Sequence, residues 1–188
     1  MSGLASLAMF YYDFRDDEKK DLHGLVSSML FQLCDQSDSY YTIISSLYST
    51  YRDGSRNPSD DELIRCLKVL LGLPGQAPIY LIIDALDECP DTSLPSHREQ
   101  VLALLQDLVD SKLPNLRICV TSRPEIDIKP ILEPLTFRSV SLHDESGQKE
   151  DIENYIKSIV NSDRRMRRWT TVHRQLVIDV LTERADGM

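Results

Sequence analysis

The sequence has no long run of apolar residues, since none approaches the roughly 18 residues that a membrane-spanning helix needs. The apolar stretch near residue 4 has no basic residue ahead of it, which is not typical of a signal peptide. Hydrophobic residues make up 41% of the 188 positions and charged residues 27%. This composition predicts a globular domain with its own core. We therefore expect a cytoplasmic protein that does not bind membranes.

Basic residues are few relative to acidic ones. The chain has 21 Lys and Arg against 30 Asp and Glu, which gives a formal net charge of -9. Nucleic acids and anionic membranes both attract proteins through a basic field, so we expect no nucleic-acid partner. The one basic cluster, residues 163–169, could contact phosphate or an acidic partner. In a chain that is acidic overall, we interpret it as a solvated loop or helix start.

Cysteines are also few, and their spacing is irregular. The four are Cys34, Cys66, Cys89 and Cys119, and no CxxC or Cys/His pair accompanies them. This spacing excludes the usual zinc sites. Each cysteine lies in or beside an apolar run, which favours buried free thiols in a reducing compartment.

What the sequence does contain is an alternation of strand-like and helical segments. The strand-like segments are 4–14, 79–83, 113–123 and 137–142. The helical segments are 16–34, 40–51, about 60–71, about 97–109, about 126–134, 148–160 and 174–188. Strands separated by helices predict an α/β fold with a mostly parallel sheet.

Local patterns refine this prediction. Apolar residues recur at helical spacing within 16–34, with acids in the expected first turn. Ser59 with Glu62, and Ser96 with Glu99, have the spacing of capping boxes. The uninterrupted apolar residues of the middle two strands predict burial on both faces of the sheet.

Three acids follow the strand in the stretch "IYLIIDALDECP", residues 79–90. Asp84 comes directly after five apolar or aromatic residues, and Asp87 and Glu88 follow within one short turn. In an open α/β sheet, ligands bind outside the carboxyl ends of the strands. An acid at such an end suits a Walker B motif, whose carboxylate binds Mg²⁺ near nucleotide phosphates. A strand-end Asp can also simply cap the next turn, but clustered acids repel each other unless a cation or water shares their charge.

Polar residues also follow the strand in "RICVTSRPE", residues 117–125. Thr121, Ser122 and Arg123 come where this strand ends. A guanidinium at the end of a strand beside the Walker B strand is suited to contact a γ-phosphate. Taken alone, Arg123 could equally form an ordinary ion pair with one of the nearby acids.

Together, "IYLIIDALDECP" and "LRICVTSRPEIDI" resemble a NACHT domain of the STAND class of P-loop NTPases. More narrowly, they resemble fungal NACHT and nephrocystin-3-like N-terminal domains, which ankyrin or WD repeats often follow. In that family a small residue follows the magnesium-binding Asp, and an acidic pair begins three positions after it, as in Asp84, Ala85, Asp87 and Glu88. The resemblance implies a parallel-sheet, P-loop NTPase-like nucleotide-binding core at 1–162 and the start of a helical region at 163–188.

The resemblance also implies roles for individual residues. Asp84 would bind Mg²⁺, and Asp87 and Glu88 would be the catalytic acids that position water or metal ligands. Ser122 and Arg123 would contact the nucleotide, with Arg123 reading the γ-phosphate of ATP or GTP. An intact parent would be a signalling switch with slow hydrolysis, with protein partners that include other NACHT domains through self-association.

Glycine is where the sequence departs from the family. Nucleotide binding in this class needs GxxxxGK[ST], a loop that surrounds the phosphates. None of the seven glycines is followed by Lys. We therefore expect that the chain begins after the P-loop, at the family's second strand, and ends before the family's further helical and winged portions. The chain alone should bind no nucleotide tightly, so its status as an enzyme stays open. The alternatives are a non-catalytic interaction module and a gene-model fragment without independent activity.

The missing segment has a consequence for the sheet. The resemblance places the P-loop strand between the family's fourth and fifth strands, which correspond here to 117–121 and 137–142. Its absence predicts either an exposed slot in the sheet or direct pairing of these two segments.

Overall fold

A computed structural model of the chain describes residues 4–13, 15, 20–50, 57–92, 95–141 and 148–184. The chain forms two compact units, Met1–Thr136 and Phe137–Met188, and each is described here by itself. The boundary that the sequence predicts between a core and a helical region, at 162/163, stays a prediction. No helix in the described ranges is both long enough and apolar enough to cross a membrane.

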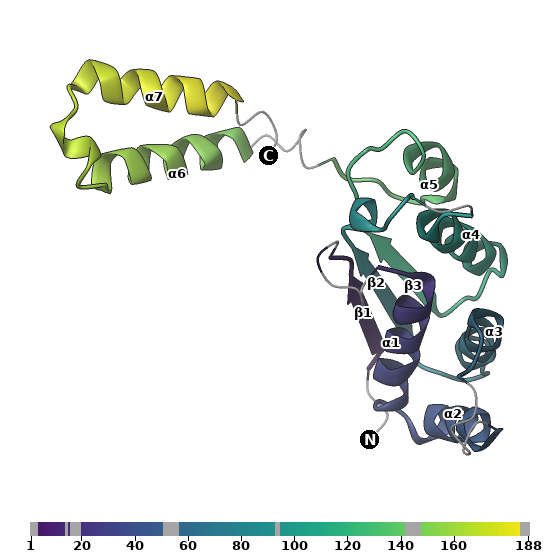
Figure 1. Cartoon of the computed structure of the whole chain (residues 1–188). Helices are drawn as coiled ribbons and strands as arrows, with labels where there is room; N and C mark the ends of the chain where they lie inside the picture. The colour runs from purple at the N-terminus through teal and green to yellow at the C-terminus, as the bar shows by residue number, and fades with distance from the viewer. Residues whose placement is uncertain are drawn as a thin grey trace. The chain divides into compact units, whose positions relative to one another are not determined.

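The first unit is built on a parallel sheet of three strands (Figure 1). The strands are β1 (Ser6–Tyr11), β2 (Ile79–Asp84) and β3 (Leu116–Val120), and their order in the sheet is β1-β2-β3. The predicted α/β class with a parallel sheet is therefore confirmed. Because all three strands are parallel, their carboxyl ends lie at the same end of the sheet. Asp84 of β2 is aligned there with Tyr11 of β1.

Helix α1 (Leu22–Cys34) packs against β1. The sequence predicted a helix over 16–34 with acids in its first turn; positions 16–19 lie outside the described residues, and the prediction is wrong for Lys20 and Asp21, which are not helical. The helix begins at Leu22, and the carboxylate of Asp21 caps it by accepting a hydrogen bond from Gly24 N at 2.8 Å. The predicted apolar face of this helix is confirmed as buried; it consists of Leu22, Leu25, Val26, Met29, Leu30 and Leu33.

The described residues of the first unit form four more α-helices. They are α2 (Asp38–Thr50), α3 (Asp60–Leu71), α4 (His97–Asp110) and α5 (Lys129–Leu135). Both predicted capping boxes are present. The carboxylate of Glu62 accepts from Ser59 N at 2.8 Å, and that of Glu99 accepts from Ser96 N at 3.0 Å.

Helices α1, α3 and α4 all lie on one side of the sheet (Figure 1). On the other face, the side chains are partly open to solvent: Leu7 and Met9 are each 50% exposed, and Tyr80 is 45% exposed. Tyr80 of β2 and Cys119 of β3 are exposed, so the prediction that these two strands are buried on both faces is wrong, and so is the prediction that the Cys119 thiol is buried. Parallel crossovers are right-handed almost without exception. A sheet wound in one direction, from β1 to β2 to β3, therefore has its crossover helices on a single face.

The two edges of the sheet differ. On β1, the side-chain amides of Gln32, in α1, and of Gln36, just after the end of α1, satisfy outward backbone groups. Gln36 bonds Leu7 N at 2.9 Å and Leu7 O at 2.6 Å, and Gln32 bonds Met9 N at 3.0 Å and Met9 O at 2.7 Å. On β3, no strand in the described ranges pairs with the outer edge. The alternative, pairing of 117–121 with 137–142, is not formed by the described residues, and the exposed slot stays a prediction because no described strand lies beyond β3 to form its other side.

The second unit contains a pair of helices that pack on each other, α6 (Gln148–Ser162) and α7 (Thr171–Arg184), joined through the short η4 (Met166–Arg168). The strand predicted at 137–142 is wrong for residues 137–141, which form no regular element. Position 142 lies outside the described residues. Strand propensity alone does not form a strand without a neighbouring strand to pair with, and Phe137 is fully exposed.

Candidate functional site

The polar residues predicted at the ends of β2 and β3 lie together at the carboxyl end of the sheet. Asp84 ends β2 and is exposed, and Thr121 follows β3. The Thr121 hydroxyl donates a hydrogen bond to the Asp84 carboxylate and accepts one from Ala85 N at 3.0 Å. This threonine therefore fixes both the acid and the turn that follows it.

Ala85 has a left-handed backbone, with φ 55° and ψ 47°. This conformation turns the chain sharply into η2 (Leu86–Glu88), and Leu86 N then donates to Thr121 O at 3.0 Å. The Leu86 side chain is fully buried and anchors the turn. A small residue suits this position because bulky and β-branched side chains strongly disfavour φ near +55°.

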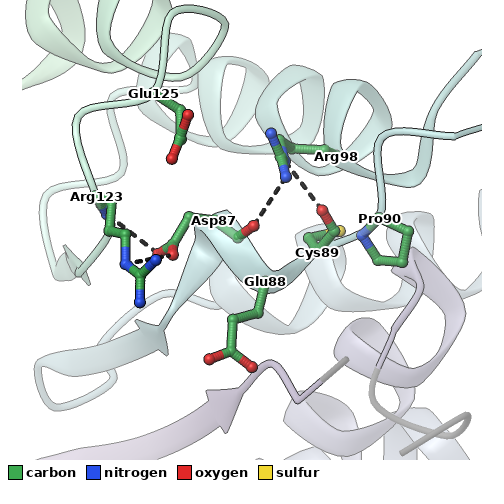
Figure 2. Close-up of a pocket in the computed structure, with 7 residues that line it drawn as sticks. All are labelled: Asp87, Glu88, Cys89, Pro90, Arg98, Arg123 and Glu125. Carbon is green, nitrogen blue, oxygen red and sulfur yellow. Dashed lines mark hydrogen bonds and ion pairs between the residues drawn. The ribbon is translucent and has the colours of Figure 1, made fainter. Parts of the chain in front are cut away.

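Asp87 and Arg123 are in direct contact (Figure 2). One carboxylate oxygen of Asp87 accepts from Arg123 N at 3.1 Å, and the other lies 3.4 Å from Arg123 Nε. The two side chains differ in exposure, at 12% for Asp87 and 79% for Arg123. The pair joins the loop after β2 to the loop after β3.

Arg98, on α4, is the residue that sequence reasoning missed. Its guanidinium donates to Cys89 O at 3.0 Å, to Asp87 O at 2.8 Å and to the Asp127 carboxylate at 2.9 Å. The sequence contained one sign of this role. A cation in the first turn of a helix is unfavourable with the helix dipole, so an arginine at that position indicates a tertiary contact. In the structure, Arg98 ties α4 to both loops of the site.

The Arg98 contact changes the titration of Asp127. Burial would raise the pKa of this carboxyl, but the hydrogen bond and the positive charge of Arg98 outweigh that effect, and the pKa lies below its ordinary value. Asp127 is therefore held in its charged form beside the arginine.

The other two predicted residues are less engaged. In Figure 2 the Glu88 side chain extends away from the Asp87–Arg123 pair. The Ser122 hydroxyl donates to Arg123 O at 2.9 Å. Asp87, Glu88 and Arg123 line an open pocket of about 380 Å³, together with Cys89, Pro90, Arg98 and Glu125. Asp84 is not among its lining residues.

A buried layer lies under the acids. Tyr12 N donates to Asp84 O at 3.0 Å, and the Tyr12 ring packs edge-on against Phe10. Burial raises the pKa of the Tyr12 hydroxyl and raises the pKa of the Cys89 thiol to about 11. Both groups are therefore neutral at physiological pH, and Cys89 is not an activated nucleophile.

The donor set can be compared with what a metal requires. Within the described residues, no group of three or more His, Cys, Asp or Glu side chains could hold a metal ion. Mg²⁺, however, is commonly held by one or two carboxylates together with water and substrate phosphates. The exposed Asp84 carboxylate fits that requirement, as a single hard oxygen donor.

Comparison with known proteins adds a family. The family model described as "Nephrocystin 3, N-terminal" matches residues 2–123, about two thirds of the chain. The chain belongs to this family. The range that matches the nephrocystin 3 N-terminal model includes all five candidate residues: Asp84, Asp87, Glu88, Ser122 and Arg123. Searches of curated proteins and of solved structures returned no match.

Proposed function

We propose that this nephrocystin 3 N-terminal domain is the metal-side and γ-phosphate-side half of a nucleotide-dependent signalling switch of the NACHT type. The observation that carries the proposal is the placement of Asp84 and Arg123 at the carboxyl ends of neighbouring parallel strands. In open α/β sheets this is where ligands bind. The two side chains have the opposite charges that a metal ion and a phosphate require.

Each residue would act by binding or positioning. Bound Mg²⁺ would neutralise phosphate charge, and Asp84 is the residue that would hold it. Thr121 would keep the Asp84 carboxylate in place through its hydrogen bond. Arg123 would bind the terminal phosphate, because a guanidinium matches phosphate oxygens in charge and geometry. Glu88 would orient water or metal ligands from the same turn.

The phosphate-binding loop must come from another segment, because this sequence contains no GxxxxGK[ST]. Within the described ranges no strand pairs with the outer edge of β3, which is where we place the strand that carries such a loop. Acids and one arginine do not replace the loop, so the 188-residue chain should bind Mg·ATP far more weakly than micromolar. Calorimetry that shows micromolar Mg·ATP binding by the chain would contradict this part of the proposal.

The metal role of Asp84 can be tested with Mn²⁺ as a paramagnetic substitute for Mg²⁺. We expect Mn²⁺ to broaden the backbone amide signals of residues 84–88 and 121–123, and expect the Asp84→Asn variant to lose this effect. Asp91→Asn is the matched control, because it removes the same charge from an exposed position of the following loop. Equal broadening in Asp84→Asn and wild type would overturn the assignment.

A second candidate function is a non-catalytic interaction module. The observation that favours it is the bare sheet face with half-exposed Leu7, Met9 and Tyr80, because contiguous exposed apolar surface often marks a protein interface. Analytical ultracentrifugation and hydrogen exchange test it together. Self-association that protects β3 amides would favour the module. A monomer at high concentration whose only binding is at residues 84–88 and 121–123 would favour the switch.

A further inference from the structure

The contact between Asp87 and Arg123 occupies both oxygens of the Asp87 carboxylate. One accepts from the Arg123 backbone N–H at 3.1 Å, and the other lies against the Arg123 guanidinium at 3.4 Å. Each carboxylate oxygen keeps a second lone pair, so these contacts alone do not exclude a water, but both oxygens face the arginine. The geometry makes Asp87 the counter-ion of the arginine.

The two members of this pair are not equally fixed. The Asp87 side chain is mostly buried, and its backbone carbonyl accepts a hydrogen bond from Arg98 at 2.8 Å. Arg98 in turn is tied to Asp127 and to Cys89 O (Figure 2 shows the Cys89 contact), and only 13% of its side chain is exposed. The guanidinium of Arg123, by contrast, is largely in solvent. When the pair opens, the arginine is therefore the side chain that moves.

We propose that Asp87 positions Arg123 and competes with phosphate for its guanidinium, and that Arg98 holds Asp87 in the place where it does so. The inference rests on the proposed function in one respect, because it takes phosphate as the ligand of Arg123. It assigns Asp87 a role in regulating the site in place of the catalytic role that the family resemblance implies. The contact with Asp87, made through Nε of the guanidinium, weakens phosphate binding at Arg123.

The size of the effect follows from the exposure of the arginine. Ion pairs with one solvent-exposed partner contribute little, so releasing Arg123 from Asp87 should tighten phosphate binding by about two- to fivefold. An effect of this size is measurable in a titration with many points.

The experiment titrates the full chain with inorganic pyrophosphate at constant ionic strength and follows the Arg123 backbone and Nε–H signals by ¹⁵N NMR. Asp87→Asn keeps the shape of the side chain and removes its charge. Asp91→Asn is the matched control, because it changes the net charge equally on the same loop. Arg123→Gln shows how much binding depends on the guanidinium.

We expect Asp87→Asn to bind pyrophosphate about two- to fivefold more tightly than Asp91→Asn does, and expect Arg123→Gln to abolish the difference. Equal affinities in Asp87→Asn and Asp91→Asn, with the Arg123 signals shifting in both, would overturn the competition and leave the phosphate role of Arg123 intact. If pyrophosphate shifts the Arg123 signals in no variant, the competition and that phosphate role both fall. The Mn²⁺ test of Asp84 is independent of either result.

The positioning role of Arg98 has its own test, with Arg98→Lys chosen because it keeps the charge and is the variant more apt to fold. A lysine cannot make three divergent hydrogen bonds. We expect faster hydrogen exchange at the Arg123 amide and tighter pyrophosphate binding, with no further tightening when Asp87→Asn is added. A lower melting temperature with unchanged Arg123 exchange and unchanged affinity would show that Arg98 is a structural brace only.

Discussion

Ala85 combines a left-handed backbone with a side chain that does not favour it. Its φ of 55° costs an L-residue roughly 1 kcal/mol, and glycine avoids this cost. Its place directly after Asp84 means that the strain is located at the candidate site. Backbone strain at a site is tolerated when surrounding contacts determine the conformation, as the contacts of Thr121 and Leu86 do here.

Ala85→Gly should therefore stabilise the protein, by up to about 1 kcal/mol, against the usual direction for this substitution. The matched control is Ala103→Gly, at an exposed position within α4, which should destabilise by about 1 kcal/mol because glycine weakens helix interiors. Urea unfolding of the two variants measures both. Destabilisation by Ala85→Gly comparable to the control would contradict the strain argument.

The buried thiol of Cys89 makes stability depend on alkaline pH. Burial raises its pKa from 9.0 to about 11, so between these values the unfolded chain releases a proton that the folded chain retains. Its contribution to stability is complete below about pH 9 and is lost as pH rises toward about 11, with a slope of up to about 1.4 kcal/mol per pH unit.

Chemical unfolding at several pH values from 8 to 11 tests this prediction, because it gives the slope of the free energy of unfolding against pH. We expect the slope to be shallower in Cys89→Ala than in wild type. Cys119→Ala, which removes an exposed thiol, should leave it unchanged. An unaltered slope in Cys89→Ala would show that this thiol is not the titrating group.

Among single residues, the sequence located the candidate site residues whose positions follow from a local pattern of apolar and polar residues. Asp84 and Arg123 could be placed because strand ends are visible in the alternation of apolar and polar residues. Arg98 could not be placed by that route, because its three partners come from loops that only the tertiary fold brings together. An ion pair between Arg123 and a nearby acid was among the alternatives, but spacing alone did not identify Asp87 as that acid.

At the scale of elements, the outer edge of β1 is closed at Leu7 and Met9 by Gln32 of α1 and by Gln36, which follows the helix. Two glutamines one helical turn apart match the spacing of alternate outward residues on a strand, and each supplies both a donor and an acceptor. This arrangement protects an otherwise open strand edge.

Gln32→Ala should accelerate hydrogen exchange at the Met9 amide by about two- to tenfold, the equivalent of one hydrogen bond of ordinary strength. The Leu7 amide, which bonds to Gln36, serves as an internal control and should change little. Gln106→Ala, at an exposed position of α4, controls for the loss of a surface amide. Equal exchange at Met9 in Gln32→Ala and wild type would show that the glutamine does not close the edge.

The sequence predicted helices more reliably than strands. Capping boxes and 3.6-residue periodicity are local signals; the predicted capping boxes are present in α3 and α4, and the predicted apolar face is buried in α1. A strand depends on a neighbour that is distant in sequence, so the alternation in 137–141 predicted a strand that does not form. The hydrogen bonds from the glutamine side chains to β1 could not be predicted from the sequence, because glutamine is common on helix surfaces.

At the scale of the whole molecule, the winding of the sheet decides which surface is covered. The consecutive apolar residues of β2 and β3 indicated two buried faces, but the strand order follows the sequence order and sends every crossover to one side. The second face can be covered only if the chain reverses direction within the sheet or another segment packs there. Composition and periodicity contain no information on this, because they do not specify strand order.

The two compact units predict separable stability. The buried apolar core of the sheet and helices α1–α4 lies within the first unit, whereas Val160 and Ile178 are the buried side chains among the described residues of the second. A fragment of residues 1–136 should therefore melt cooperatively within about 3 °C of the full chain, and a fragment of 137–188 should show no cooperative transition. Circular dichroism of both fragments measures this. A drop of more than about 8 °C in the first fragment would show that the second unit contributes to its stability.

The difference between the two sheet edges sets a limit on stoichiometry. A molecule with two open edges can add neighbours without end and so build a fibre. Here the glutamines leave β1 no free groups at Leu7 and Met9, and of the three described strands β3 is the one whose outer edge can accept a strand. Any assembly that grows by strand addition through these edges therefore terminates after one addition, as a pair or as one chain with one inserted segment.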